Sequence, residues 1–577
     1  MKITDEPTWF GAPGNPLFGW LTRPTSTSIL GGVVIVPSVG YEARNSKIAL
    51  RNLAWSLARS GFVTLRFNFR GTGDSSGDFG ESLPNPDWID DTVSAIGFIQ
   101  SAGLQQVSLV GFRIGATLAA AALSDPSVNV TSLVLWDPCD SGWSYLRELR
   151  ALESLRRSHF ADSDDGSVET TEFLFSKEMV TALRSLKMTT LLKDQSVEHI
   201  LVVTRTLRPL PSKLRDQLQM MGATFSTTDE QELLLDVEPF DAAAPFATIA
   251  SIESWFSQLA TNSVEHVSFA PIVETLTTAE NDETSIRERA TFLGEKGLFA
   301  MLCEPVHSHV GPWIVMIGNV HDDHTGPSRI WVELSRRWAR SGLRCARVDL
   351  SGMGESNRPD QAPFVEHLDS RWVKDVITLA HSLDSKDPSN IVFIGFCASA
   401  TLAMEGALAL NAKGICLVNP ALGRNLSHTI YRLQQAPSQI PRFFAKKLKR
   451  LLLSHPWIAT TMWETARHGF PGKWSRDILH DIQKGGSDIL FVSNADDLSK
   501  FSNVPIVRSI EGRRVHTNRN YMFQIVPDLD HAMNVASGRI KTVALLEDYV
   551  QSTFATEAER KLSTPFLEQG FEDDSVH

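Results

Sequence analysis

Cysteine is scarce in this chain of 577 residues, and its few copies are spread along the sequence. The five are Cys139, Cys303, Cys345, Cys397 and Cys416, and none belongs to a CxxC pair or to a cluster with histidine. Zinc sites and disulfide frameworks need closely spaced cysteines, so the sequence indicates neither, and we expect no metal. A sparse, odd number of cysteines is typical of a reducing compartment, and we expect a cytoplasmic protein.

Long apolar runs are also missing. No stretch approaches the roughly 18 apolar residues that cross a bilayer, and the N-terminus lacks the apolar segment of a signal peptide. Glycine-rich nucleotide loops are absent too, because Gly71-Thr72-Gly73 and Gly352-Met353-Gly354 lack a third glycine, so no cofactor is expected. The net charge is −12, which argues against general binding of nucleic acid.

The composition is otherwise that of a folded protein, with 42% hydrophobic and 21% charged residues. A chain of this length exceeds the size at which one hydrophobic core stops growing, so at least two domains are expected.

The sequence repeats itself over the length of a domain. Four blocks recur in the same order at an offset of 281 to 284 residues. The pairs are 57–61 with 338–342, 70–75 with 351–356, 110–115 with 394–399, and 135–138 with 417–420. We interpret this as a tandem duplication, with one domain over 1–262, a second over 283–560 and an acidic tail over 561–577 that we expect to be disordered.

Both copies alternate short apolar runs with segments of helical spacing. Strands are predicted in the first copy at 32–36, 62–69, 107–110 and 133–136, and in the second at 313–317, 345–350, 391–394 and 415–418. Helices are predicted between them, at 48–60, 92–100, 116–123, 330–341, 372–383 and 402–410. This alternation predicts an α/β fold with two tandem, mostly parallel sheets that carry helices on both faces. Helical caps are expected after Pro138 and after Pro420.

One motif carries chemistry. Gly395-Phe396-Cys397-Ala398-Ser399 lies between an apolar strand and an alanine-rich helix, which is the context of a nucleophile elbow. Small residues two positions either side of Cys397 let the strand and helix pass closely. The helix N-terminus favours a negative charge at the thiol. We expect the N–H of Ala398 to donate to an oxyanion, and a second donor near Val320 in the loop after 313–317.

At these motifs the chain resembles the α/β-hydrolase family across both halves, nearest to its serine-aminopeptidase-like and dienelactone-hydrolase-like branches. The resemblance implies Cys397 as nucleophile and His531, in the segment 524–533, as base. It implies Asp496 as the acid, with Ser493 three positions ahead, and leaves Asp497 as the alternative. The order nucleophile, acid, histidine is that of the family. His321 and His324, in the loop that would form a wall of the pocket, are either substrate contacts or solvated.

The first copy lacks all three catalytic roles. Arg113 occupies its elbow, the segment 201–206 has no carboxylate, and 234–241 has no histidine. Arginine stays protonated and cannot be a nucleophile. We therefore interpret this copy as degenerate. It is either a structural partner of the second copy or a site where Arg113 binds an anion.

The basic segment 442–453 in the second cap stands out in an acidic protein. It is either a solvated helix face or a docking surface for an acidic carrier protein, a coenzyme A phosphate or an anionic membrane surface. For the whole chain we expect a hydrolase that cleaves an ester or thioester through an acyl–Cys397 intermediate. The alternatives are an acyltransferase, because polyhydroxyalkanoate synthases of the resembled superfamily use an elbow cysteine, and a non-catalytic scaffold.

Overall fold

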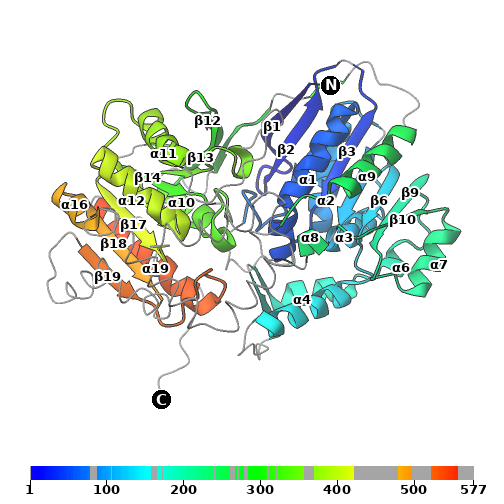
Figure 1. The fold of residues 1–577 in the computed structure, drawn as a ribbon. Coiled ribbons are helices and arrows are strands. Elements are labelled where there is room, and N and C mark those ends of the chain that lie inside the picture. Colours follow the sequence, from blue (N-terminus) through cyan, green and yellow to red (C-terminus); the bar gives the residue numbers. More distant parts are fainter. Residues whose placement is uncertain are drawn as a thin grey trace, which may run out of the picture.

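The protein forms two α/β units, each built on one large sheet (Figure 1). We call them the N-terminal half, which ends with helix α9, and the C-terminal half, which begins with strand β11. The computed structural model describes the chain except for residues 1, 27, 78–87, 106, 157–165, 172, 231, 236, 238–241, 260–266, 270–271, 279–283, 308–310, 320–321, 357–369, 421–477, 495–520 and 556–577.

The sheet of the N-terminal half has eight strands in the order β1-β2-β4-β3-β5-β6-β9-β10. Its strands are β1 (Ile3–Phe10), β2 (Leu17–Pro24), β3 (Gly31–Val36), β4 (Phe62–Phe67), β5 (Val107–Phe112), β6 (Val130–Trp136), β9 (His199–Arg205) and β10 (Thr224–Thr228). The strands from β4 to β10 are parallel, whereas β1 and β2 form an antiparallel hairpin at one edge. A small hairpin of β7 (Val168–Thr170) and β8 (Phe173–Phe175) stands apart from this sheet.

The sheet of the C-terminal half repeats this order with one added edge strand, as β11-β12-β13-β15-β14-β16-β17-β18-β19. Its strands are β11 (Thr275–Thr278), β12 (Ile286–Leu293), β13 (Leu298–Pro305), β14 (Trp313–Ile317), β15 (Arg344–Val348), β16 (Ile391–Phe396), β17 (Gly414–Val418), β18 (Asp488–Ser493) and β19 (Tyr521–Ile525). Beyond β11, the strands correspond one for one to those of the first sheet. The two sheets confirm the predicted α/β class. A tandem duplication predicts such a matching strand order, and the duplication itself stays a prediction.

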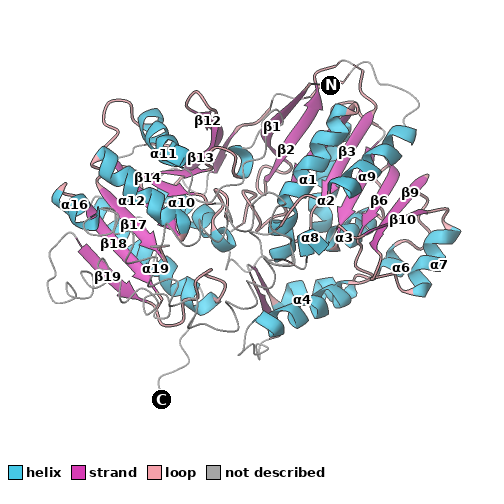
Figure 2. Ribbon diagram, viewed as in Figure 1, coloured by secondary structure: helices cyan, strands magenta, loops and turns pink. Residues whose placement is uncertain are grey.

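Helices cover both faces of each sheet (Figure 2). In the N-terminal half α1 (Tyr41–Arg59) and α9 (Phe246–Leu259) share one core, and α2 (Trp88–Ser101) and α3 (Ile114–Ala122) share the other. In the C-terminal half the matching pairs are α10 (Ile330–Arg340) with α19 (Ala536–Phe554), and α11 (Ser370–Leu383) with α12 (Ala398–Leu410). The remaining helices are α4 (Gly142–Arg156), α5 (Lys177–Ser185), α6 (Met188–Leu191), α7 (Ser212–Met220), α8 (Glu232–Leu235), α16 (Ile478–Lys484), η2 (Pro327–Arg329) and η3 (Gly354–Ser356).

The central strands are apolar along their whole length because both of their faces are covered. In β16, Ile391 and Phe393 face one core while Val392, Ile394 and Phe396 face the other. Each fully buried side chain of this size contributes on the order of 2 kcal/mol. This packing fixes the end of β16, where Cys397 follows.

Two features differ from the sequence prediction. Each sheet begins with an antiparallel hairpin, β1–β2 or β12–β13, which the predicted parallel strands did not include. Strand β11, which no predicted strand covers, pairs with β12. It lies just ahead of residue 283, where the second domain is predicted to begin, and that boundary stays a prediction.

An aromatic cluster joins the two halves. Trp20 of β2 has its ring centroid 5.2 Å from that of Phe299 in β13 and 6.4 Å from that of Phe292 in β12. Trp9 and Phe18 belong to the same buried cluster, and the N–H of Trp9 donates to the carbonyl of Val273. The two units are therefore packed together through their hairpins.

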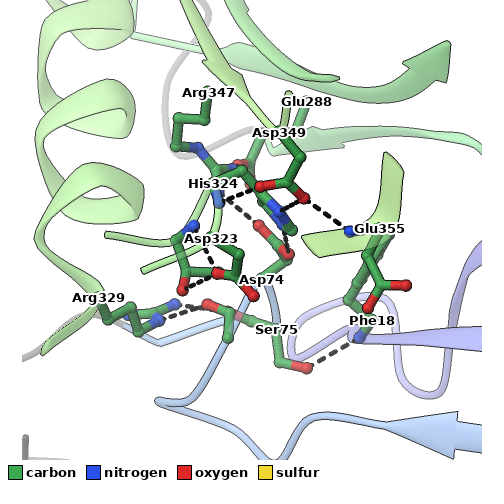
Figure 3. A network of polar contacts seen from close by, with 12 residues as sticks. Phe18, Asp74, Ser75, Glu288, Asp323, His324, Arg329, Arg347, Asp349 and Glu355 are labelled. Carbon is green, nitrogen blue, oxygen red and sulfur yellow. Dashed lines mark hydrogen bonds and ion pairs between the residues drawn. The ribbon is translucent and has the colours of Figure 1, made fainter. Parts of the chain in front are cut away.

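A buried polar network lies beside this cluster (Figure 3). Asp74 of the N-terminal half reaches into the C-terminal half, where it pairs with Arg347 and lies 2.8 Å from Nε2 of His324. Nδ1 of His324 lies 2.8 Å from Asp349. The guanidinium of Arg329 donates to the carbonyls of Gly73 at 2.6 Å and of Ser75 at 2.7 Å.

Candidate active site

Cys397 stands between β16 and α12 with φ 52° and ψ −113°. A positive φ is uncommon for a residue with a side chain and costs on the order of 1–3 kcal/mol. Gly395 permits the close crossing of strand and helix, because a Cβ there would lie 2.4 Å from the oxygen of Ser399 and 2.5 Å from Cα of Ala400. The strand, turn and helix predicted for an elbow are all present.

The hydroxyl of Ser399 closes this turn. It accepts the N–H of Phe396 and lies 3.0 Å from the carbonyl of the same residue. The N–H of Cys397 donates to the carbonyl of Val418 at 3.0 Å, which holds the elbow to β17. Ala398 is the first residue of α12, and the first four N–H groups of a helix have no acceptor inside it. Its role as an oxyanion donor stays a prediction.

The structure brings the predicted nucleophile and base together. Sγ of Cys397 lies 3.3 Å from Nε2 of His531, which is within hydrogen-bonding reach of sulfur. The imidazole also lies beside the ring of Phe396, with 6.3 Å between centroids. Of the five cysteines, Cys397 alone is not buried. It is therefore the one thiol that both meets a histidine and reaches the surface.

The other predicted site residues lie outside the described residues. They are Asp496, Asp497, Val320 and His321. The basic segment 442–453, most of the second cap and the tail 561–577 also lie outside them.

Asn419, the first residue after β17, links the loops on either side of the site. Its Nδ2 donates to the carbonyls of Asp530 at 3.0 Å and His531 at 3.1 Å. Its Oδ1 accepts the backbone N–H of Asn494, two positions before Asp496, at 3.1 Å. Sequence analysis treated Asn419 only as part of the repeat. Its place at the end of a strand next to the elbow was the available signal.

Asn319 and Asp322, in the loop after β14, bind each other next to the elbow. The N–H of Asn319 donates to the carbonyl of Asp322 at 2.6 Å, and the N–H of Asp322 donates to Oδ1 of Asn319 at 2.9 Å. Nδ2 of Asn319 lies 3.5 Å from the carbonyl of Phe396, the residue before Cys397. Asn319 and Asp322 flank Val320, so this is the turn on which the second oxyanion donor was predicted.

His324 does not have the role that the sequence suggested. Its side chain is 1% exposed, and both of its nitrogens face carboxylates, those of Asp74 and Asp349. It is neither a substrate contact nor a solvated residue, because the packing of the N-terminal half encloses it. Burial alone would lower the pKa of His324, but these two carboxylates raise it to about 10.

A cavity of about 230 Å³ lies between the two halves. Its lining includes Arg44 and Asn45 of α1, and Asn319 and Asp322 of the turn after β14. Neither Cys397 nor His531 is among the described residues that line it. The cavity is thus a feature of the interface and reaches the predicted site only through that turn.

The elbow of the N-terminal half keeps its backbone shape. Arg113 has φ 55° and ψ −121°, close to the values at Cys397. A Cβ at Gly111 would lie 2.4 Å from Cα of Ala116, which repeats the close crossing at Gly395. The two turns therefore share one backbone geometry, although the residue on this one cannot act as a nucleophile.

Carboxylates surround the side chain of Arg113. Its Nε donates to Glu42 at 3.0 Å, and its other nitrogens pair with Glu148 and Asp137. Arg205, in the segment predicted to lack an acid, lies 3.0 Å from the same Asp137. Burial raises the pKa of Glu42, whereas Arg113 and Arg208 lower the pKa of Glu148 against the effect of burial. An added anion would meet these negative charges, which argues against an anion site at Arg113.

The remaining cysteines are buried, as predicted for Cys345 and Cys416. Burial raises the pKa of the thiols of Cys139, Cys303, Cys345 and Cys416. Within the part of the chain that the structure describes, no group of His, Cys, Asp and Glu is arranged to hold a metal ion. No helix in that part is long and apolar enough to cross a membrane.

Comparison with known proteins finds a family match within the C-terminal half. Residues 314–540 match the model of the alpha/beta hydrolase family. No curated protein matches the chain.

Similar solved structures each align with less than half of the chain. Est1E from Butyrivibrio proteoclasticus, with ferulic acid bound, is 12% identical over 44% of this chain and 96% of its own, with a TM-score of 0.34. The esterase Pf2001 of Pyrococcus furiosus is 12% identical over 45% and 94%, with a TM-score of 0.31. DcsB, in complex with a substrate analogue, is 13% identical over 45% and 99%, with a TM-score of 0.32.

The strand order, the elbow after β16 and the family match over residues 314–540 agree with one another. The C-terminal half of this protein has an α/β-hydrolase fold.

Proposed function

We propose that the C-terminal half is a hydrolase that cleaves an ester or thioester through an acyl–Cys397 intermediate. The observation that carries this proposal is the 3.3 Å contact between Sγ of Cys397 and Nε2 of His531 at a strained turn before a helix. A thiol, a base within reach and a helix N-terminus are what cysteine nucleophiles use.

In the proposed reaction Nε2 of His531 takes the thiol proton, and the thiolate attacks the carbonyl carbon of the substrate. The resulting oxyanion accepts hydrogen bonds from the N–H groups of Ala398 and Val320. Its collapse expels the alcohol or thiol, which takes the proton from His531. Water, deprotonated by His531, then attacks the acyl-enzyme and releases a carboxylic acid and the free thiol.

Asp496 is the proposed third member of the triad, with Asp497 as the alternative. A carboxylate there would fix the tautomer of His531 and stabilise its protonated form. The link from Asn419 to Asn494 on one side and to His531 on the other supports this, because it holds the start of the acid loop beside the histidine loop.

We further propose that the N-terminal half is a degenerate copy of the same fold. The matching strand order and the retained elbow at Arg113 support this, together with the carboxylates that now fill its surroundings. The substrate is proposed to be an acyl compound, free or linked to a carrier protein or coenzyme A, with the basic segment 442–453 as the docking surface. A cytoplasmic location remains part of this proposal.

The test is turnover of short-chain p-nitrophenyl esters and acyl thioesters, with intact-mass detection of an acyl adduct. Cys397→Ala should abolish both turnover and adduct, whereas Cys139→Ala, at a buried cysteine, should retain both. Unchanged turnover in Cys397→Ala would remove the nucleophile assignment. Adding amine or alcohol acceptors distinguishes hydrolysis from acyl transfer, and no adduct across the panel would favour a scaffold.

A further inference from the structure

The turn between β14 and η2 depends on the N-terminal half for part of its support. The N–H of Asn319 donates to the carbonyl of Asp322, and the N–H of Asp322 donates to the side-chain Oδ1 of Asn319. Nδ2 of Asn319 also lies 3.3 Å from Oδ2 of Asp322. The remaining oxygen of Asp322, Oδ1, lies 2.8 Å from Nη2 of Arg44 in helix α1. Arg44, a residue of the N-terminal half, therefore forms an ion pair with the carboxylate that is hydrogen-bonded to Asn319.

This carboxylate needs a cation. Its side chain is 4% exposed, and burial raises the pKa of Asp322 even though Arg44 works to lower it. Without Arg44, the buried carboxylate would lose the counter-ion that lies 2.8 Å from it, and the pKa of Asp322 would rise further. The larger the share of the neutral form, the less firmly the group holds Asn319, because charge-assisted hydrogen bonds are about twice as strong as neutral ones.

The next residue of α1 to cross the interface repeats the arrangement. Lys47, one helical turn beyond Arg44, pairs with Asp323, next to Asp322 in sequence. Two cations on one face of α1 thus meet two consecutive acids of the loop after β14. Spacing of three residues places both on the same side of the helix.

A second contact between the halves lies near the histidine loop. Oε1 of Glu169, in the hairpin β7–β8, accepts the N–H of Ala536 at 3.0 Å. Ala536 opens helix α19, five residues after His531, and Val535 before it offers no capping side chain. The N-terminal half therefore caps the helix that follows the histidine loop.

From these contacts we infer that the N-terminal half acts as an activating domain for the C-terminal half of the same chain. It holds the turn at Asn319 and Asp322 through Arg44, and it holds the end of the histidine loop through Glu169. Arg44 acts as a positioning residue, because it reaches the reacting atoms only through Asp322 and Asn319. The inference rests on the proposed function, since that function assigns an oxyanion donor to this turn.

The test compares two arginines on α1 that both cross the interface. Arg44→Met removes the cation at the turn. Arg51→Met is the matched control, because Arg51 donates to Gly354 and faces Glu355, which belong to η3 and not to the loop after β14. Weakening of the interface alone would affect both variants alike.

We expect Arg44→Met to lower kcat for a p-nitrophenyl ester about tenfold and to leave KM within about twofold of the wild-type value. Complete loss of one oxyanion donor lowers kcat by about 10²–10³-fold, and a smaller loss is expected here because the turn is only loosened. The affinity for a trifluoromethyl ketone, which places an oxyanion in the same position, should fall about tenfold too. Alkylation of Cys397 by iodoacetamide, which needs no oxyanion donor, should stay within about twofold. Arg51→Met should stay within about twofold in all three measurements.

A double-mutant cycle locates the effect. In an Asp322→Asn background, Arg44→Met should change kcat by less than about twofold, because its partner is already gone. Equal losses in the two arginine variants, or full additivity in the cycle, would overturn the inference.

Absence of turnover in the wild-type protein would count against the proposed function alone. Hydrogen exchange tests the inference in that case too. The amides of Asn319 and Asp322 are both hydrogen-bonded within the turn. Peptides covering 318–324 should exchange about fivefold faster in Arg44→Met than in wild type or Arg51→Met. Unchanged exchange in Arg44→Met would reject the role of Arg44.

Discussion

The side chain of Asn419 contacts both loops on which the proposed triad depends. It is 1% exposed and has φ 42°, so both its amide and its backbone are constrained. Its counterpart at the end of β6, Asp137, has φ 45° and faces Arg113 instead. The same backbone position thus serves a histidine loop in one half and an ion-pair cluster in the other.

Replacing Asn419 separates the contribution of its amide from that of its backbone. Asn419→Gly relieves the positive φ but loses the donors to Asp530 and His531, so kcat/KM should fall about tenfold. Asn419→Ala loses the same donors and adds strain, so it should show a similar loss of activity and a lower melting temperature. Steady-state kinetics and thermal unfolding of both variants measure this.

A result in which Asn419→Gly keeps full activity would show that the amide does not position His531. Leu408→Ala, at a side chain that is 42% exposed on α12, is a suitable control and should change neither measurement.

At the residue scale, sequence reasoning found what a short motif can carry. Cys397 and His531 were predicted from local patterns, and the structure places them in contact. Arg44, Glu169 and His324 could not be assigned in this way, because each acts on residues more than 200 positions away. Side chains that meet only through packing of the two halves leave no local signature.

The hairpins β1–β2 and β12–β13 are the elements that bind the halves together. Trp20 packs on Phe299 and Phe292, and the guanidinium of Arg66 lies 5.5 Å from its ring centroid. Trp20→Ala should therefore cost about 3–5 kcal/mol in the free energy of unfolding, because a large buried ring leaves a cavity in both halves at once.

The matched control for this change is Trp143→Ala. The side chain of Trp143 is 45% exposed on α4 and stacks with Arg184, so its loss should cost no more than about 1 kcal/mol. Denaturant unfolding followed by fluorescence and by far-UV circular dichroism measures both variants. Equal destabilisation by the two changes would show that the aromatic cluster does not join the halves.

At the element scale, prediction succeeded for the buried parallel strands and failed for these hairpins. Strand β14 was predicted at 313–317, as observed, because a short apolar run bounded by other residues is typical of a strand covered on both faces. Strands β2 and β13 are apolar too, but the core that they share is built from side chains of both halves. The length and periodicity of their apolar runs alone did not show that these segments are strands of a hairpin.

Considered as a whole, the molecule packs its two halves around a quasi-symmetric interface. The N–H of Phe18 donates to Ser75, and the N–H of Phe299 donates to Ser356, at positions related by the repeat. Arg66 and Arg347, also related by it, each bind an acid of the opposite half, Glu355 and Asp74 respectively. Positions related by the sequence repeat thus make matching contacts across the interface, as the two subunits of a twofold dimer do.

His324 breaks this symmetry and makes the interface sensitive to pH. The carboxylates of Asp349 and Asp74 outweigh burial and raise the pKa of His324 from 6.5 to about 10 in the folded protein. Its stabilising effect is therefore fully present below pH 6.5 and is lost as the pH rises through about 10. Between these values the folded state binds one more proton than the unfolded state, so stability should fall by about 1.4 kcal/mol per pH unit from this residue.

His324→Gln removes this dependence while Asp74 keeps its ion pair with Arg347. The free energy of unfolding, measured by denaturant titration from pH 6 to 10, should be lower than wild type near pH 6.5. The two values should converge toward pH 10. His199→Gln, at a side chain that is 39% exposed, should follow the wild-type curve. A difference in the free energy of unfolding between His324→Gln and wild type that stays constant across this range would mean that His324 is not protonated at the interface. Arg347 and backbone amides would then be the groups that hold Asp74 and Asp349 there.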